Sequence, residues 1–167
     1  FVTPIVSPPI AEYTFNNTYN NINGNTGFVN TGATSFITDR NGVANNALQI
    51  TGGAGTQAGI TAPLGNASRS VSLWYRVNVL SSTSGLFYYG TGANGIFGSY
   101  ITMFGANAYH TFQNGQSDFI STGLYSANNW RHLVVTYDGI NVSIYVNGAF
   151  IGNSPYNLAT TASNFVL

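Results

Sequence analysis

The chain has no cysteine and no lysine, and only 5% of its 167 residues are charged. Ordinary soluble domains carry about 25% charged residues. The acidic residues are Glu12, Asp39, Asp118 and Asp138, and the basic ones are Arg40, Arg69, Arg76 and Arg131. The formal net charge is zero, so no basic surface attracts nucleic acid or an anionic membrane. We therefore expect neither kind of partner.

Two further absences narrow the class of protein. The lack of cysteine argues against the disulfide-rich extracellular modules of animals. No run of 18 apolar residues occurs, so we expect no membrane-spanning helix. The sequence begins at Phe1, without an initiator methionine or a secretory signal, and we expect it to be a processed or excised piece of a longer polypeptide.

With so few charged residues, the polar groups that solvate the surface of this chain must be mostly uncharged. Asparagine alone occurs 22 times, and serine, threonine and glutamine supply further amides and hydroxyls. These groups pair well with sugar hydroxyls. They also suit a densely packed extracellular repeat protein, and composition leaves both interpretations open.

Proline separates the start of the chain from the rest. Residues 1–11 hold three of the five prolines, and such a segment is extended and cannot be a helix or a central strand. We interpret it as a linker or leading segment. Residues 12–167 then form one β-sandwich domain.

The pattern after residue 12 is typical of an all-β protein. Short runs of Val, Ile, Tyr, Phe and Thr alternate with breaks rich in Asn and Gly. The breaks contain the turn-forming pairs Asn23-Gly24, Asn41-Gly42, Asn94-Gly95, Asn114-Gly115, Asp138-Gly139 and Asn147-Gly148. Such pairs tolerate positive φ and mark hairpins, whereas no window shows the 3.6-residue period of a helix. The sequence predicts a sandwich or barrel.

The clearest strands form a meander over residues 130–152, with strands at His132–Tyr137 and Asn141–Val146 and a third from Ala149 to Gly152. Val71–Val77 is another predicted strand, with Val71, Leu73, Tyr75 and Val77 on one face. Further predicted strands are Glu12–Phe15, Ala47–Ile50, Leu86–Tyr89, Tyr100–Phe104 and Tyr109–Gln113. Trp74 and Trp130 lie beside aliphatic strand residues, and we expect both to be packing residues.

Three segments together resemble the concanavalin A-like, laminin-G-like (LamG) superfamily. They are NNWRHLVVTYDGINVSIYVNGAFIG at 128–152, SVSLWYRVN at 70–78 and TDRNGVANNALQITGG at 38–53. The chain is most similar to LamG-like domains of bacterial surface proteins, especially those of Bacteroidota. The resemblance implies a two-sheet antiparallel jelly roll, the fold of concanavalin A-like lectins and glucanases.

The chain departs from that family in two places. Its opening segment has Asn where family members carry Asp, so carboxylates that help to hold calcium are missing. Family members also close with a further strand, and this sequence stops at Asn164-Phe-Val-Leu167 before any such strand. A sheet that lacks its last strand has unpaired backbone groups at its edge, and a strand from elsewhere can add there. We therefore expect a neighbouring domain or a partner strand to complete the sheet.

Catalysis is not expected. Glycoside hydrolysis needs two carboxylates roughly 5–9.5 Å apart, and the four acids are scattered along the chain. The Gly-x-Ser-x-Gly motif that carries a nucleophilic serine does not occur. The family resemblance implies that His132 has a structural role. For a metal, Asp39 is a weak candidate ligand for Ca²⁺. Pairing with Arg40 or a role in a turn is the favoured interpretation, because calcium is bound by several oxygen ligands that include carboxylates, and the chain has four acidic residues in all. We expect no cofactor.

Sugar binding needs aromatic faces beside amides and hydroxyls. Residues 86–120 offer such groups, although alternate aromatics there must also fill the core. The candidate ligand-binding residues are Tyr100, Tyr109, His110, Asn114, Gln116 and Asp118, and the preferred region is 109–118.

Taken together, these features predict a non-catalytic recognition or adhesion module of a secreted or cell-surface protein, which binds a glycan or a surface protein. The alternative is a purely structural spacer in a filament, phage particle or surface layer. The two differ in one observable, because a binding module exposes aromatic side chains on one face whereas a spacer buries nearly all of them.

Overall fold

The computed structural model describes residues 8–24, 27–29, 33–51, 55–80 and 82–167. These residues form strands and turns, and none of them is helical. Accordingly, no helix among them has the length and hydropathy that crossing a bilayer requires. The chain divides into two compact units, Phe1–Ala62 and Pro63–Leu167. The prediction of one domain from residue 12 onward stays a prediction.

The first unit contains an antiparallel hairpin of β1 (Ala33–Ile37) and β2 (Ala47–Thr51) and a short strand β3 (Gln57–Ala58). The predicted strand at Glu12–Phe15 is wrong. Phe15 has a φ of 53° and Asn17 a φ of 50°, and this left-handed backbone turns the chain where an extended strand would have to continue.

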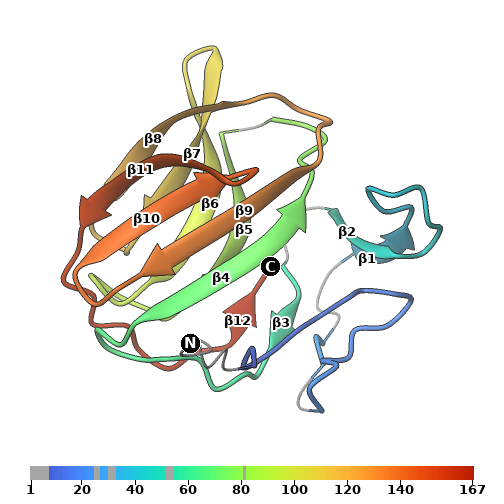
Figure 1. Cartoon of the computed structure of the whole chain (residues 1–167), viewed down its shortest axis with the longest axis horizontal. Coiled ribbons are helices and arrows are strands. Elements are labelled where there is room, and N and C mark those ends of the chain that lie inside the picture. The colour runs from blue at the N-terminus through green and yellow to red at the C-terminus, as the bar shows by residue number, and fades with distance from the viewer. Residues whose placement is uncertain (1–7, 25–26, 30–32, 52–54, 81) are drawn as a thin grey trace, which may run out of the picture. The chain divides into compact units, whose positions relative to one another are not determined.

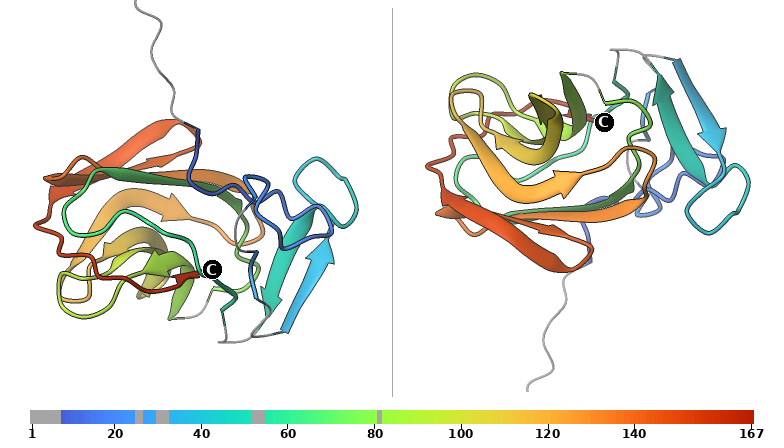
Figure 2. Two further views of the ribbon diagram at one scale, coloured as in Figure 1. Left: turned by 90° about the horizontal axis from the view of Figure 1, so that it is seen from below. Right: turned by 90° about the horizontal axis from the view of Figure 1, so that it is seen from above.

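The second unit is a two-layer sandwich, whose layers are visible edge-on in Figure 2. Its strands are β4 (Arg69–Tyr75), β5 (Thr83–Tyr89), β6 (Phe97–Phe104), β7 (Asn107–Gln113), β8 (Asp118–Tyr125), β9 (Arg131–Tyr137), β10 (Asn141–Val146), β11 (Ala149–Pro155) and β12 (Phe165–Val166). What we call the first sheet has the order β12-β5-β6-β7-β8, and the second sheet has the order β11-β10-β9-β4 (Figure 1). All its pairs are antiparallel. The predicted all-β jelly-roll sandwich is confirmed.

Alternating side chains from both sheets fill the core. The most deeply buried are Phe87, Tyr89, Phe97, Ile101 and Phe112 from the first sheet and Leu133, Val135, Tyr137, Val142 and Ile144 from the second. The predicted meander is present as β9, β10 and β11. Its Asn147-Gly148 turn has positive φ at both residues, 51° and 80°, as a two-residue hairpin turn of the type I′ class requires.

Strand β4 shows the predicted alternation, since Tyr75 faces the core and Trp74 faces outward. The expectation that Trp74 is a packing residue is wrong, because its side chain is 47% exposed and lies beside His132. At the other end of the chain, Phe165–Val166 forms β12, and Val166 pairs with Tyr88 of β5. A further closing strand stays a prediction.

Candidate functional site

A row of four residues crosses the first sheet on its outer face. The backbone register places Tyr88 of β5 opposite Gly98 of β6, Gly98 opposite Gln113 of β7, and Gln113 opposite Asp118 of β8. Neighbouring strands lie about 4.8 Å apart, so the row brings an aromatic, a glycine, an amide and a carboxylate side by side. Tyr88 is 37% exposed.

The Tyr100 ring lies over this row. Tyr100 is two residues beyond Gly98 on β6 and pairs with Gly85 of β5. A Cβ built on Gly98 would lie 3.0 Å from both Cε2 and the hydroxyl oxygen of Tyr100, and one built on Gly85 would lie 3.7 Å from the same ring. The rings of Tyr88 and Tyr100 are stacked with centroids 6.4 Å apart and an interplanar angle of 17°. We call this pair the tyrosine platform.

Polar groups flank the tyrosine platform. Gln113 Nε2 donates to Asp118 Oδ2 at 3.3 Å. Burial, and then the neighbouring Tyr88 and Asp118, raise the pKa of Tyr100 to about 12, so its hydroxyl stays a donor at neutral pH. Within the described part of the chain, nothing accepts a hydrogen bond from that hydroxyl, so a ligand can.

The outer face continues as an apolar area around Tyr109. The rings of Tyr109 and Phe104 have centroids 6.1 Å apart, and Tyr109 pairs with Leu124 of β8. Phe104, Leu124 and Ile120 are all exposed. Tyr109 therefore shares a face with the tyrosine platform, but it lies further along the strands and is not part of the row.

His110 points the other way, into the core. It is 1% exposed and hydrogen-bonds through Nε2 to the Tyr75 hydroxyl on the opposite sheet. Burial lowers the pKa of His110 to about 4, so the ring is neutral at physiological pH. The His110 side chain lies between the two sheets, so we do not expect it to contact a ligand directly.

Asn114 and Gln116 belong to the turn between β7 and β8. Asn114 is buried, and its Oδ1 accepts from the backbone N–H groups of Gln116 and Ser117 at 2.9 and 2.8 Å, while its Nδ2 donates to Asn94 Oδ1. Asn114 thus organises two turns. Gln116 is exposed beside the row. Of the six predicted residues, Tyr100 and Asp118 are the two that the fold brings together.

Asp39, the weak candidate for a metal ligand, holds its own loop together. Its carboxylate accepts from the backbone N–H groups of Asn41 and Val43 at 2.8 and 2.9 Å and from Asn46 Nδ2 at 2.7 Å. The bond from Asn46 and those from the backbone hold the pKa of Asp39 below its usual value. In the described ranges, no three His, Cys, Asp or Glu side chains gather as metal ligands would.

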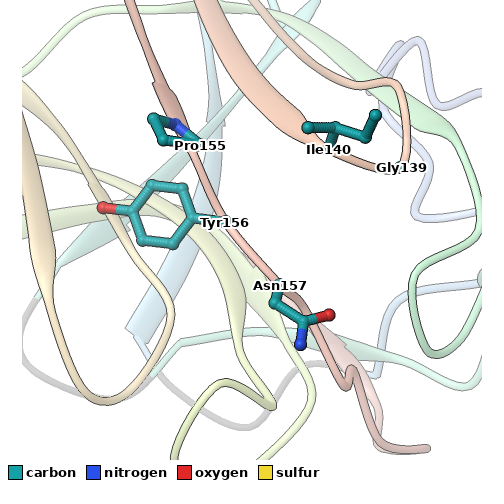
Figure 3. A pocket seen from close by; sticks show the side chains of 5 residues that line it. All are labelled: Gly139, Ile140, Pro155, Tyr156 and Asn157. Carbon is teal, nitrogen blue, oxygen red and sulfur yellow. The ribbon is translucent and has the colours of Figure 1, made fainter.

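A shallow depression of about 340 Å³ lies elsewhere, between the β9–β10 turn and the segment after β11 (Figure 3). It is lined by Gly139, Ile140, Pro155, Tyr156 and Asn157. The ring of Tyr156 points away from Ile140 and packs edge-on against Phe112, with centroids 5.0 Å apart. Without a charged group or an available aromatic face, this depression offers little to recognise a ligand.

The six candidate residues leave out three members of the site, Tyr88, Gly98 and Gln113. Gly98 contributes by having no side chain, and Gln113 contributes by its register against Asp118. Alternation along β7 could have placed Gln113 on the face of Tyr109, because the two are four residues apart in a strand.

Comparison with known proteins agrees with this architecture. Residues 51–167 match the family model described as the concanavalin A-like lectin/glucanases superfamily. Among solved structures, the chain is similar to domain 4 of AbnA, a GH43 extracellular arabinanase from Geobacillus stearothermophilus, in complex with arabinotriose. The TM-score is 0.71 at 19% sequence identity, over 95% of this chain and 82% of that one. No curated protein matches by sequence. The chain belongs to the concanavalin A-like lectin/glucanases superfamily.

Proposed function

We propose that the protein is a non-catalytic, extracellular glycan-binding module that holds its ligand on the outer face of the first sheet. The observation that carries this proposal is the tyrosine platform, with Tyr88 and Tyr100 stacked beside the Gln113–Asp118 pair. The C–H face of a sugar stacks on an aromatic ring. Its hydroxyls bond to amide, carboxylate and phenol groups, and all three lie beside the rings.

The exposed aromatics favour binding over the spacer alternative. A spacer should bury nearly all of its aromatic side chains. Here Tyr88 and Phe104 are exposed on the outer face of the first sheet, and Trp74 and Phe150 on the second sheet. On the first sheet, Phe104 joins Tyr109 and Leu124 in one apolar area, and a contiguous area of this kind is typical of a site that contacts another molecule.

The acids available near the platform favour a non-catalytic role. Glycosidases use two carboxylates on either side of the scissile bond. Asp118 is the only acidic residue between residues 83 and 125, and the Asp138 carboxylate accepts backbone N–H groups of its own turn at 2.8 and 2.7 Å. A single carboxylate can orient a sugar but cannot supply both roles.

Arabinotriose is the first probe, because the similar AbnA domain is described in complex with it. We would titrate arabinotriose calorimetrically and screen the same protein on a glycan array, each with calcium and again with a chelator. We expect binding that survives chelation, since the proposed contacts need no metal.

Two variants locate the site. Tyr100→Ala removes the central ring and should weaken binding at least tenfold. Phe150→Ala is the matched control, because it removes an exposed aromatic from the second sheet and should leave the affinity unchanged. A blank array from folded protein would overturn the proposal and favour the structural spacer.

A further inference from the structure

We infer that the tyrosine platform selects uncharged glycans and rejects acidic ones. This inference rests on the proposed function and names the ligand class of the same site. Its basis is the distribution of charge on the first sheet, where the one ionised side chain is an acid in the row itself.

No cation is available to meet an acidic sugar. The chain contains no lysine, and none of its four arginines lies between residues 83 and 125, the segment that supplies β5 to β8. Within the second unit, Arg69 is buried, and Arg76 and Arg131 lie over the rings of Trp130 and Tyr125. His110, the histidine of β7, faces the core. Recognition of carboxylates and sulfates relies on Arg or Lys, and the outer face offers neither.

The one charge on this face is negative and lies beside the rings. Asp118 ends the row that begins at Tyr88, and it shares the amide of Gln113. Its field reaches the Tyr100 hydroxyl, whose proton it helps to retain. A uronic acid or sulfated sugar stacked on Tyr100 would bring a second negative charge to this carboxylate without any compensating partner.

The neighbouring surface does not relieve that repulsion. The next residues along the strands are the neutral Tyr100, Thr111 and Ile120, and Phe104, Tyr109 and Leu124 lie beyond them. None of these side chains carries a positive charge that would offset the repulsion between like charges. Neutral sugars meet no such penalty, because their hydroxyls can donate directly to the Asp118 carboxylate. The row thus binds hydroxyl donors and disfavours anions.

The test uses probes in matched neutral and acidic forms. Arabinotriose is compared with its aldonic acid, and cello-oligosaccharides are compared with their C6-oxidised uronic forms, all on one array at low salt. We expect each bound neutral probe to exceed its acidic counterpart at least tenfold in affinity, which corresponds to about 1.4 kcal/mol. Raising the salt should narrow the gap, because the repulsion is screened.

Asp118→Asn isolates the cause. The amide keeps the size and one acceptor but loses the charge that strengthens hydrogen bonds from sugar hydroxyls. Neutral probes should therefore bind somewhat more weakly, while the preference for neutral over acidic probes shrinks severalfold. Asp138→Asn is the matched control, since it makes the same change of net charge in the β9–β10 turn of the second sheet and should keep the full preference.

The outcomes are distinguishable. Equal binding of neutral and acidic probes by the unchanged protein would overturn this inference and leave the proposed function standing. The same holds if Asp118→Asn retained the full preference, because the rejection would then come from another cause. Loss of all binding to both classes would overturn the proposed function, and this inference with it.

Discussion

Arg69 gives the sharpest prediction about stability. It is 7% exposed, and among the described residues no carboxylate pairs with it. Its guanidinium donates instead to three backbone carbonyls, Ala67 at 2.8 Å, Pro63 at 2.7 Å and Gly65 at 2.5 Å, and to the Tyr89 hydroxyl at 3.0 Å. A buried charge is tolerated only when it is fully hydrogen-bonded.

Aromatic rings complete the surroundings of this cation. The guanidinium carbon lies 5.3 Å from the ring centroid of Tyr137, 5.4 Å from that of Phe97 and 6.0 Å from that of Tyr89. Cation–π contacts of this kind are worth about 0.5–2 kcal/mol depending on desolvation. The same side chain therefore ties the loop before β4 to the core of the sandwich.

Arg69→Met keeps an unbranched apolar stem and removes every donor. Each acceptor left unpaired in the interior costs about 1–3 kcal/mol, and since water can reach part of this loop, we expect a total loss of about 4 kcal/mol. For a chain of this size that lowers the melting temperature by roughly 8–16 °C. Arg69→Lys keeps the charge, but one compact ammonium cannot meet carbonyls that lie in three directions, so it should lose about half as much.

Urea unfolding followed by circular dichroism measures both variants against the unchanged protein. A loss below about 1 kcal/mol for Arg69→Met would show that the four hydrogen bonds contribute little, since a single net bond is worth about as much. Equal stability of Arg69→Lys and the parent would refute the requirement for a planar donor set.

Two further perturbations follow from buried contacts. Because burial lowers the pKa of His110 to about 4, the unfolded chain, with a pKa of about 6.5, binds the proton first. Stability should therefore fall by up to about 3 kcal/mol as the pH drops from about 6.5 to 4, and His110→Gln should flatten that part of the pH–stability curve. Gly152→Ala places a Cβ 2.7 Å from Phe119 Cζ at a φ of 145°, so thermal melts should show a loss of about 1–3 kcal/mol, and an unchanged melting temperature would contradict the contact.

The meander of β9, β10 and β11 was predictable because alternation and turn chemistry agree there. Val142, Ile144 and Val146 alternate along β10 and are buried, and Asn147-Gly148 forms the turn. Strand β8 was missed. Its register against β7 shifts between Tyr109 and Thr111, and a bulge of this kind breaks the two-residue period that sequence reasoning depends on.

The candidate site was predictable only in part, for a geometric reason. Tyr109 and His110 are adjacent in one strand, so they must face opposite sides of the sheet. The sequence cannot tell which of them faces the core, and both became candidates. Likewise, Gln113 belongs to the site only through its pairing with Asp118 on the next strand, and register between strands is a property of the folded chain.

The tyrosine platform depends above all on atoms that are missing at Gly98. A Cβ there would lie 2.8 Å from the Cβ of Tyr88, which the strand holds fixed, and 3.0 Å from the ring of Tyr100. Gly98→Ala should therefore swing Tyr100 off the row and weaken glycan binding severalfold, although no aromatic or polar group is removed. Because the added carbon also meets the Tyr88 Cβ, the variant should lose some stability, and circular dichroism with a thermal melt first shows that it is folded. Gly85→Ala is its matched control, because the added carbon meets the same ring at an ordinary 3.7 Å. Calorimetric titration of both variants with one bound glycan decides the matter, and equal affinities would mean that the ligand does not stack on Tyr100.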